Sequence, residues 1–213
     1  MATAELDYTQ RMNADTRWAL REGGMFFQNE SEVQHSLRRL AQRLNALGTN
    51  YAVVGGMALW LHGFRRYTEN INILITREDL PAVHQALLGS GYRLSQVSRS
   101  NIHDTENGVY IKFMVSDDVP DPQRVSAQQD GVWLLNLAPL LNLKLISGNK
   151  SIERLKDTAD VQEMIKLLQL PQDFAEQLSP RVRGTYHELW QGSQPDPDSQ
   201  WNEDRWPDEK RQG

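Results

Sequence analysis

Two asparagines, Asn70 and Asn72, lie two positions apart in a segment where isoleucines recur at every second residue, Ile71, Ile73 and Ile75. This period of two predicts a β-strand, so both asparagine side chains should point to the same face of it. Two side chains placed in this way can ligate a divalent cation, but Mg²⁺ prefers carboxylate oxygens, and amide oxygens alone should bind it much more weakly. The spacing of a metal site is therefore present without the negative charges that would hold the metal.

The elements that position these asparagines follow from the hydrophobic pattern on either side. Tyr51 to Val54 predicts a short strand that ends at Gly55 and Gly56, and Met57 to His62 predicts a short helix. Longer helices are expected at Glu32–Leu47 behind a Ser31/Gln34 capping box, and at Asp79–Leu88, Ala138–Ser147 and Ile152–Gln169, with two more after Pro171 and Pro180. Further strands are expected at Tyr92–Val97, Val109–Val115 and Val132–Leu135, and a loop at Asp117–Gly131. This order predicts an α+β fold with a mixed β-sheet flanked by helices and a helical C-terminal region.

The stretch from Val53 to Ile75 resembles the nucleotidyltransferase superfamily, in the branch that includes the toxin-like proteins of abortive-infection (AbiEii-type) systems. Members of this branch have Gly-Gly or Gly-Ser after a first strand, then a short helix, Arg-x-Thr, and Asp-x-Asp on the next strand. The matching residues here are Gly55, Gly56, Arg66, Thr68, Asn70 and Asn72. A later stretch is similar to the family's C-terminal helical signature, with Lys144, Gly148, Arg154, Lys156, Asp157 and Asp160. The resemblance extends from about Met25 to Trp190 and implies a nucleotidyltransferase-like core.

The resemblance also implies a nucleotide site. In such a site two carboxylates share Mg²⁺ ions that bridge the phosphates and activate the nucleophile, and the glycines let backbone amides approach the phosphates. It assigns nucleotide binding to Gly55, Gly56, Arg66, Thr68, Lys144 and Asp157. Asn70 and Asn72 stand at the catalytic carboxylate positions, and Lys112 stands where a later strand often supplies a third acid.

The replacement of these acids predicts a catalytically degenerate nucleotidyltransferase-like protein with no metal or other cofactor. Arg66, Lys112 and Lys144 would form a cationic pocket that binds a nucleotide or another anion, and a protein partner is a further expectation. The sequence does not separate natural from engineered asparagines at positions 70 and 72.

Two alternatives stay open. One is an active Mg²⁺-dependent, toxin-like enzyme that modifies RNA or protein through other acids, namely Glu69, Asp157 or Asp160. Glu69 should point to the opposite face of the strand from Asn70, which argues against rescue from there. The other alternative is a protein-interaction module that uses the helical region and the two tryptophans of the C-terminal tail, Trp201 and Trp206.

Composition excludes several other classes. The chain has 213 residues, a formal net charge of −5 and no cysteine, which rules out disulfides, thiolate catalysis and cysteine zinc sites. The negative charge disfavours general coating of nucleic acid but leaves a local contact open. The five histidines lack zinc-protease spacing, and neither a nucleophile-elbow nor a P-loop motif occurs. No apolar run approaches the roughly 18 residues of a membrane span, so we expect no membrane contact and a cytoplasmic location.

The chain divides into four predicted segments. Residues 1–30 form a partly helical leader, 31–135 the nucleotidyltransferase-like core, 136–190 the helical region, and 191–213 an acidic tail. The tail contains three prolines and few large apolar groups, so it should be mostly disordered.

Overall fold

The computed structural model describes residues 6–151 and 154–194. Apart from residues 191–194, the predicted acidic tail lies outside this part of the chain, and its disorder stays a prediction. None of the helices in the described ranges is both long enough and apolar enough to cross a membrane.

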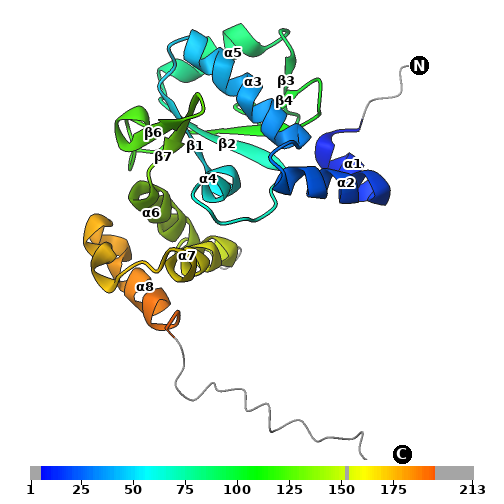
Figure 1. Ribbon diagram of the computed structural model, residues 1–213. Helices are drawn as coiled ribbons and strands as arrows, with labels where there is room; N and C mark the ends of the chain where they lie inside the picture. The colour runs from blue at the N-terminus through cyan, green and yellow to red at the C-terminus, as the bar shows by residue number, and fades with distance from the viewer. Residues whose placement is uncertain (1–5, 152–153, 195–213) are drawn as a thin grey trace, which may run out of the picture.

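A mixed seven-stranded sheet forms the centre of the molecule, in the order β3-β4-β5-β2-β1-β7-β6 (Figure 1). The strands are β1 (Tyr51–Val54), β2 (Asn70–Ile75), β3 (Tyr92–Leu94), β4 (Ile102–Asp104), β5 (Tyr110–Met114), β6 (Ser126–Gln129) and β7 (Val132–Leu135). The pairs β2/β5 and β1/β7 are parallel, and the other neighbours are antiparallel. The central strands are rich in valine and isoleucine, and these side chains are almost fully buried.

The described residues form eight α-helices in addition to the sheet. They are α1 (Tyr8–Ala14), α2 (Thr16–Phe27), α3 (Glu32–Ala46), α4 (Gly55–Leu61), α5 (Asp79–Leu87), α6 (Leu137–Gly148), α7 (Leu155–Leu168) and α8 (Pro180–Gln191). Two 3₁₀ helices, η1 (Gln123–Val125) and η3 (Gln172–Gln177), complete the set for the same part of the chain. Figure 1 shows α3 and α5 above the sheet, α6, α7 and α8 gathered below it, and α1 with α2 at one side. The predicted α+β class, with a helical C-terminal region, is confirmed.

The start of α3 confirms the predicted capping box. The Ser31 hydroxyl accepts from the backbone N–H of Gln34, and the Gln34 side-chain oxygen accepts from the backbone N–H of Ser31 at 2.8 Å. These two bonds satisfy N–H groups that have no partner inside the helix.

Three predictions about the sheet were wrong. The strand expected at Tyr92–Val97 ends at Leu94, and β4 was not expected. The segment Asp117–Gly131, predicted as a loop, contains η1 and β6. Strand β6 has the sequence Ser-Ala-Gln-Gln and is the edge strand next to β7. An edge strand is held by backbone hydrogen bonds to a single neighbour and can form without apolar side chains, so no hydrophobic pattern marked it in the sequence.

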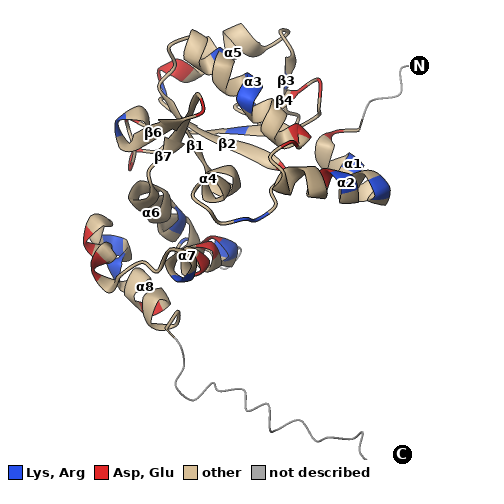
Figure 2. Ribbon diagram, in the orientation of Figure 1, with Lys and Arg blue, Asp and Glu red and all other residues tan. Residues whose placement is uncertain are grey.

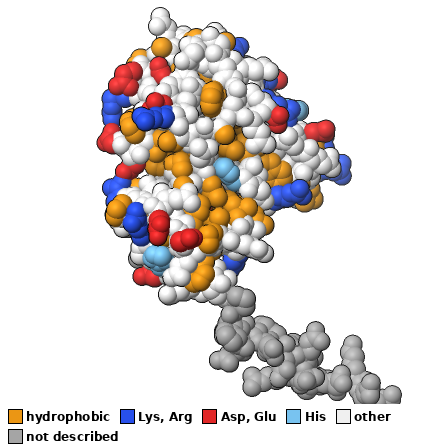
Figure 3. Space-filling model, turned by 60° about the vertical axis from the view of Figure 1, so that its left-hand side comes forward, with side chains coloured by type: hydrophobic (Ala, Val, Ile, Leu, Met, Phe, Trp, Pro, Cys, Tyr) orange, Lys and Arg blue, Asp and Glu red, His pale blue; other side chains and the backbone are white. Residues whose placement is uncertain are grey.

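Hydrophobic side chains are also exposed on the C-terminal helices. Figure 3 shows them gathered on the lower half of the face in view. On α7, Leu155, Leu167 and Leu168 are each exposed by more than a third of their surface. The predicted partner-binding surface of the helical region stays a prediction.

Candidate functional site

One edge of the sheet brings together the residues that the sequence singled out. Strand β1 ends at this edge, while the antiparallel β2 and its parallel neighbour β5 begin there. Asn72 is therefore in register with Val54 on one side and with Lys112 on the other, and Asn70 is in register with Tyr110. Because register partners point to the same face, Asn70, Asn72 and Lys112 share one face of the sheet.

Three side chains of this face, those of Asn70, Asn72 and Lys112, have no hydrogen-bond or ion-pair partner among the described residues. Asn70 is exposed, and Asn72 and Lys112 are half-buried. Among the residues that the structure describes, none forms a hydrogen bond or an ion pair with the amides of Asn70 and Asn72 or with the ammonium of Lys112. An uncompensated positive charge therefore lies beside two amides that are free to donate.

This set of donors does not fit Mg²⁺. The cation prefers carboxylate oxygens, whereas this face offers two neutral amides and a positive charge that repels a metal ion. Within residues 6–151 and 154–194, no group of three or more His, Asp or Glu residues is placed to hold a metal. No metal-dependent step can be derived from these residues.

Gly55 and Gly56 lie directly against two of the predicted site residues. A Cβ at Gly55, which has φ +69°, would overlap the side-chain amide of Asn72. A Cβ at Gly56 would lie 2.7 Å from the Thr68 hydroxyl oxygen and 2.9 Å from the Thr68 Cβ. The glycines thus make room for the side chains of Asn72 and Thr68.

We expect Gly56→Ala to destabilise the protein by about 1–3 kcal/mol, because the added methyl group overpacks against the β-branched and buried Thr68. The matched control is Gly23→Ala in α2, where an added Cβ has no atom within 4 Å. That change should stabilise the protein by about 0.5–1 kcal/mol, since alanine costs less entropy in a helix. Urea unfolding followed by circular dichroism measures both, and equal effects of the two changes would contradict the packing account.

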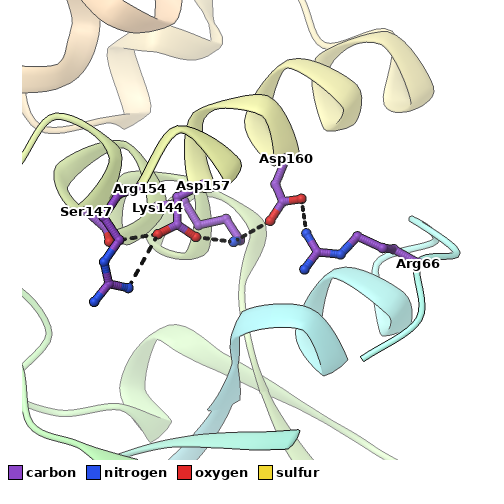
Figure 4. Close-up of polar contacts among 6 residues, drawn as sticks. All are labelled: Arg66, Lys144, Ser147, Arg154, Asp157 and Asp160. Atoms are coloured by element: carbon purple, nitrogen blue, oxygen red, sulfur yellow. Dashed lines mark hydrogen bonds and ion pairs between the residues drawn. The ribbon is translucent and has the colours of Figure 1, made fainter. Parts of the chain in front are cut away.

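Arg66 and Lys144 belong to a different cluster, a chain of alternating charges between α6, α7 and the loop before β2 (Figure 4). The Lys144 ammonium donates to Asp160 at 2.8 Å and to Asp157 at 2.9 Å, and Arg66 donates to the other oxygen of Asp160. The Ser147 hydroxyl donates to Asp157 at 2.8 Å. We call Arg66, Lys144, Asp157 and Asp160 the charge chain.

The charge chain is largely shielded from water. The side chains of Lys144 and Asp160 are 8% and 6% exposed, so Lys144 does not extend its ammonium to solvent. Burial alone would raise the pKa of Asp157, but the charge and hydrogen bond of Lys144, assisted by Ser147 and Arg154, hold that pKa below its usual range. Two cations and two anions cancel, so the expected cationic pocket of Arg66, Lys112 and Lys144 retains a single unpaired charge, that of Lys112.

Side chains of both charge signs also lie along α7 (Figure 2). Arg154 lies 4.0 Å from Asp157, and Lys166 lies 3.0 Å from Glu163. An ion pair therefore lies at the start of α7, and Asp160 connects the same helix to Arg66. Lys156, which belongs to the stretch similar to the family's C-terminal helical signature, is exposed.

Two cavities lie away from this edge of the sheet. One of about 610 Å³ is next to η3 and α8, and one of about 470 Å³ is next to β3. Neither is lined by Asn72, Lys112 or Lys144.

His62, the residue that follows α4, has a structural role. Its Nε2 forms a hydrogen bond with the backbone oxygen of Leu135 at 2.8 Å.

Comparisons with solved structures give two chains to which this one is similar. The antigenic nucleotidyltransferase-like protein from Paracoccidioides brasiliensis is 22% identical, with a TM-score of 0.46 over 64% of this chain and 76% of its own. JHP933 from Helicobacter pylori is 16% identical, with a TM-score of 0.46 over 76% of this chain and 91% of its own. No protein-family model and no curated protein matches the sequence, so the AbiEii-type branch stays a prediction.

Sequence reasoning did not find the residues that surround this edge. Tyr8 and Glu22 come from the segment interpreted as a leader, yet both are buried and bonded next to Tyr67. A hydrogen bond between residues 59 positions apart leaves no periodic signal in the sequence.

Proposed function

We propose that this protein binds the phosphate groups of a nucleotide without a divalent metal and without transferring a nucleotidyl group. The observation that carries the proposal is the unpaired Lys112, in register with Asn72 at the edge where β2 and β5 begin. In the family that the sequence resembles, metal ions would compensate the phosphate charge at this place. Here the lysine supplies the positive charge.

Each residue of the face has a distinct part in the proposed binding. The Lys112 ammonium attracts phosphate oxygens and donates charge-assisted hydrogen bonds to them. The amides of Asn70 and Asn72 donate further hydrogen bonds to the same oxygens. Arg66 is engaged with Asp160, so its part is to fix the loop that leads to Thr68 and β2.

The absence of carboxylates from the face supports binding without transfer. Asp157 and Asp160 are bonded to Lys144, and Asp160 also to Arg66, so neither is free to hold a metal. No observation favours the alternative of an active Mg²⁺-dependent enzyme.

The test is calorimetric titration of ATP, GTP, CTP and UTP, with EDTA or with Mg²⁺, into the protein and its Lys112→Met variant. We expect at least one nucleotide to bind in EDTA. Lys112→Met should weaken that binding about 10- to 100-fold, because it removes a charged hydrogen bond that contributes about 1.5–3 kcal/mol. Methionine keeps the length and the apolar stem of the side chain.

The matched control is Lys166→Met, which removes the same charge from the exposed surface of α7. It should leave the affinity within about twofold, because exposed charges at a distance are screened by salt. Binding that requires Mg²⁺, or equal affinities of the protein and Lys112→Met, would refute the proposal.

A further inference from the structure

We infer that the N-terminal helix pair, Asp7–Phe27, positions the starts of β2 and β5, which carry the candidate site. Tyr8 is the positioning residue. The expected effect of the helix pair on ligand affinity rests on the proposed function. We call this pair the clasp. It comprises α1, α2 and the Asp7 cap, and lies at one side of the sheet (Figure 1).

Tyr8 contacts the segments before both strands. Its backbone N–H donates to the backbone oxygen of Gly108 at 3.2 Å, two residues before β5 begins. Its hydroxyl lies 2.6 Å from that of Tyr67, three residues before β2 begins. One residue outside the sheet thus connects the approaches to the strands that carry Lys112 and Asn72.

Tyr8 makes a third contact, also through its hydroxyl. It donates to Glu22 of α2 at 2.9 Å, and the same Glu22 oxygen accepts from the backbone N–H of Glu32 at 2.7 Å. Tyr8 is 1% exposed and Glu22 is 2% exposed. The carboxylate therefore ties the clasp to the start of α3, and the position of Tyr8 is determined by hydrogen bonds at both ends of the residue.

Aromatic packing holds the same loop. The ring of Phe26, at the end of the clasp, lies 4.9 Å from that of Tyr67 and 4.8 Å from that of Trp60 on α4. Tyr67 directly precedes Thr68, which packs on Gly56. A displacement of the clasp would thus move Tyr67 and, through Thr68, the junction of β1 with α4.

Gly108 allows the clasp to approach this closely. It has φ +68°, and a Cβ there would lie 2.8 Å from the backbone nitrogen of Tyr8 and 3.1 Å from the Cα of Asp7. A methyl group at this position must displace backbone, because no flexible side chain is available to move. Gly108→Ala is therefore a change that loosens the clasp from outside the candidate site.

Gly131 provides a matched control. It also has positive φ, +78°, and a Cβ there would have no atom within 4 Å. Gly131→Ala incurs similar backbone strain without contact with the clasp. The difference between the two variants isolates the contact of Gly108 with Asp7 and Tyr8. Tyr8→Phe is a second variant, which keeps the ring and removes the bonds to Glu22 and Tyr67.

The first measurement is hydrogen exchange, which needs no ligand. In Gly108→Ala and in Tyr8→Phe we expect amide exchange to rise at least fivefold in α1 and in residues 65–70 and 108–112, with no such local rise in Gly131→Ala. If α1 exchanges faster and the two strand-start segments do not, the clasp does not position them. If neither variant changes the exchange of α1, these contacts do not hold the clasp. Either result would overturn the inference.

The second measurement is nucleotide titration in EDTA with the same variants. We expect Gly108→Ala and Tyr8→Phe to bind at least fivefold more weakly, and Gly131→Ala to bind like the unmodified protein. Unchanged affinity together with raised exchange in the strand starts would overturn the coupling to the site while leaving the proposed function intact. Failure of the unmodified protein to bind any nucleotide would refute the proposed function, and the exchange data would still decide whether the clasp positions the strand starts.

Discussion

Replacement of Lys144 by methionine should lower the free energy of unfolding by about 3 kcal/mol, because removing one partner of a buried ion pair leaves an uncompensated charge. The Lys144 ammonium lies within 2.9 Å of both Asp157 and Asp160, and the methionine would leave these carboxylates facing an apolar group. Asp160 would keep Arg66, and Asp157 would keep Ser147 and the more distant Arg154. Urea unfolding at pH 7, followed by circular dichroism, gives the difference.

The sign of the pH dependence follows from the lowered pKa of Asp157. Its carboxylate stabilises the fold fully above its unfolded pKa of about 3.9, and this contribution disappears as the pH falls through the lower folded value. The stability difference between the protein and Lys144→Met should therefore shrink as the pH is lowered from 7 towards about 3. Lys166→Met is the control, with an expected effect within about 0.5 kcal/mol, since its pair with Glu163 is exposed. A Lys144→Met effect no larger than that of the control would contradict the assignment.

Introducing carboxylates at positions 70 and 72 should weaken metal-free nucleotide binding and still give little affinity for Mg²⁺. The carboxylate introduced by Asn72→Asp would lie next to Lys112 on β5, with the two strands about 4.8 Å apart. The new negative charge would pair with the ammonium, so the face would neither attract phosphate nor hold a metal. We expect a loss of at least tenfold in nucleotide affinity in EDTA, which is about 1.4 kcal/mol.

Adding Lys112→Asp to these two changes should produce Mg²⁺ binding, because three carboxylates would then share the face. Titration of Mg²⁺ and of Mg²⁺ with ATP into the double and triple variants separates the effect of the lysine from that of the asparagines. The Lys112→Asp single variant is the control for the lost cation. Equal Mg²⁺ affinity of the double and triple variants would show that Lys112 does not determine the metal preference of this face.

The local features of the site were predictable, and its long-range contacts were not. Alternating isoleucines placed Asn70 and Asn72 on one face of a strand, and the register of β2 with β5 puts Lys112 beside Asn72. By contrast, Arg66 and Asp160 are 94 positions apart, and no periodic pattern signals that they meet. The resemblance implied that Lys144 is a pocket residue, but the carboxylates that neutralise it come from the next helix.

The contacts of Gly55 and Gly56 were likewise not predictable from the local sequence. The resemblance implied that Gly55 and Gly56 let backbone amides approach phosphates, and this stays a prediction. What approaches these glycines is the protein's own Asn72 and Thr68, and that follows from the antiparallel pairing of β1 with β2, in which Val54 is the partner of Asn72. A pattern in one segment does not say which other segment will lie against it.

The position of β1 in the sheet has a consequence for synthesis on the ribosome. One neighbour of β1 is β2, which follows within about 20 residues, but the other is β7, whose last residue is Leu135. While the intervening segment is translated, one edge of an apolar strand stays unpaired for several seconds at about 5–20 residues per second. An open edge of this kind can pair with other nascent chains, so the yield of folded protein should depend on how fast the ribosome reaches β7.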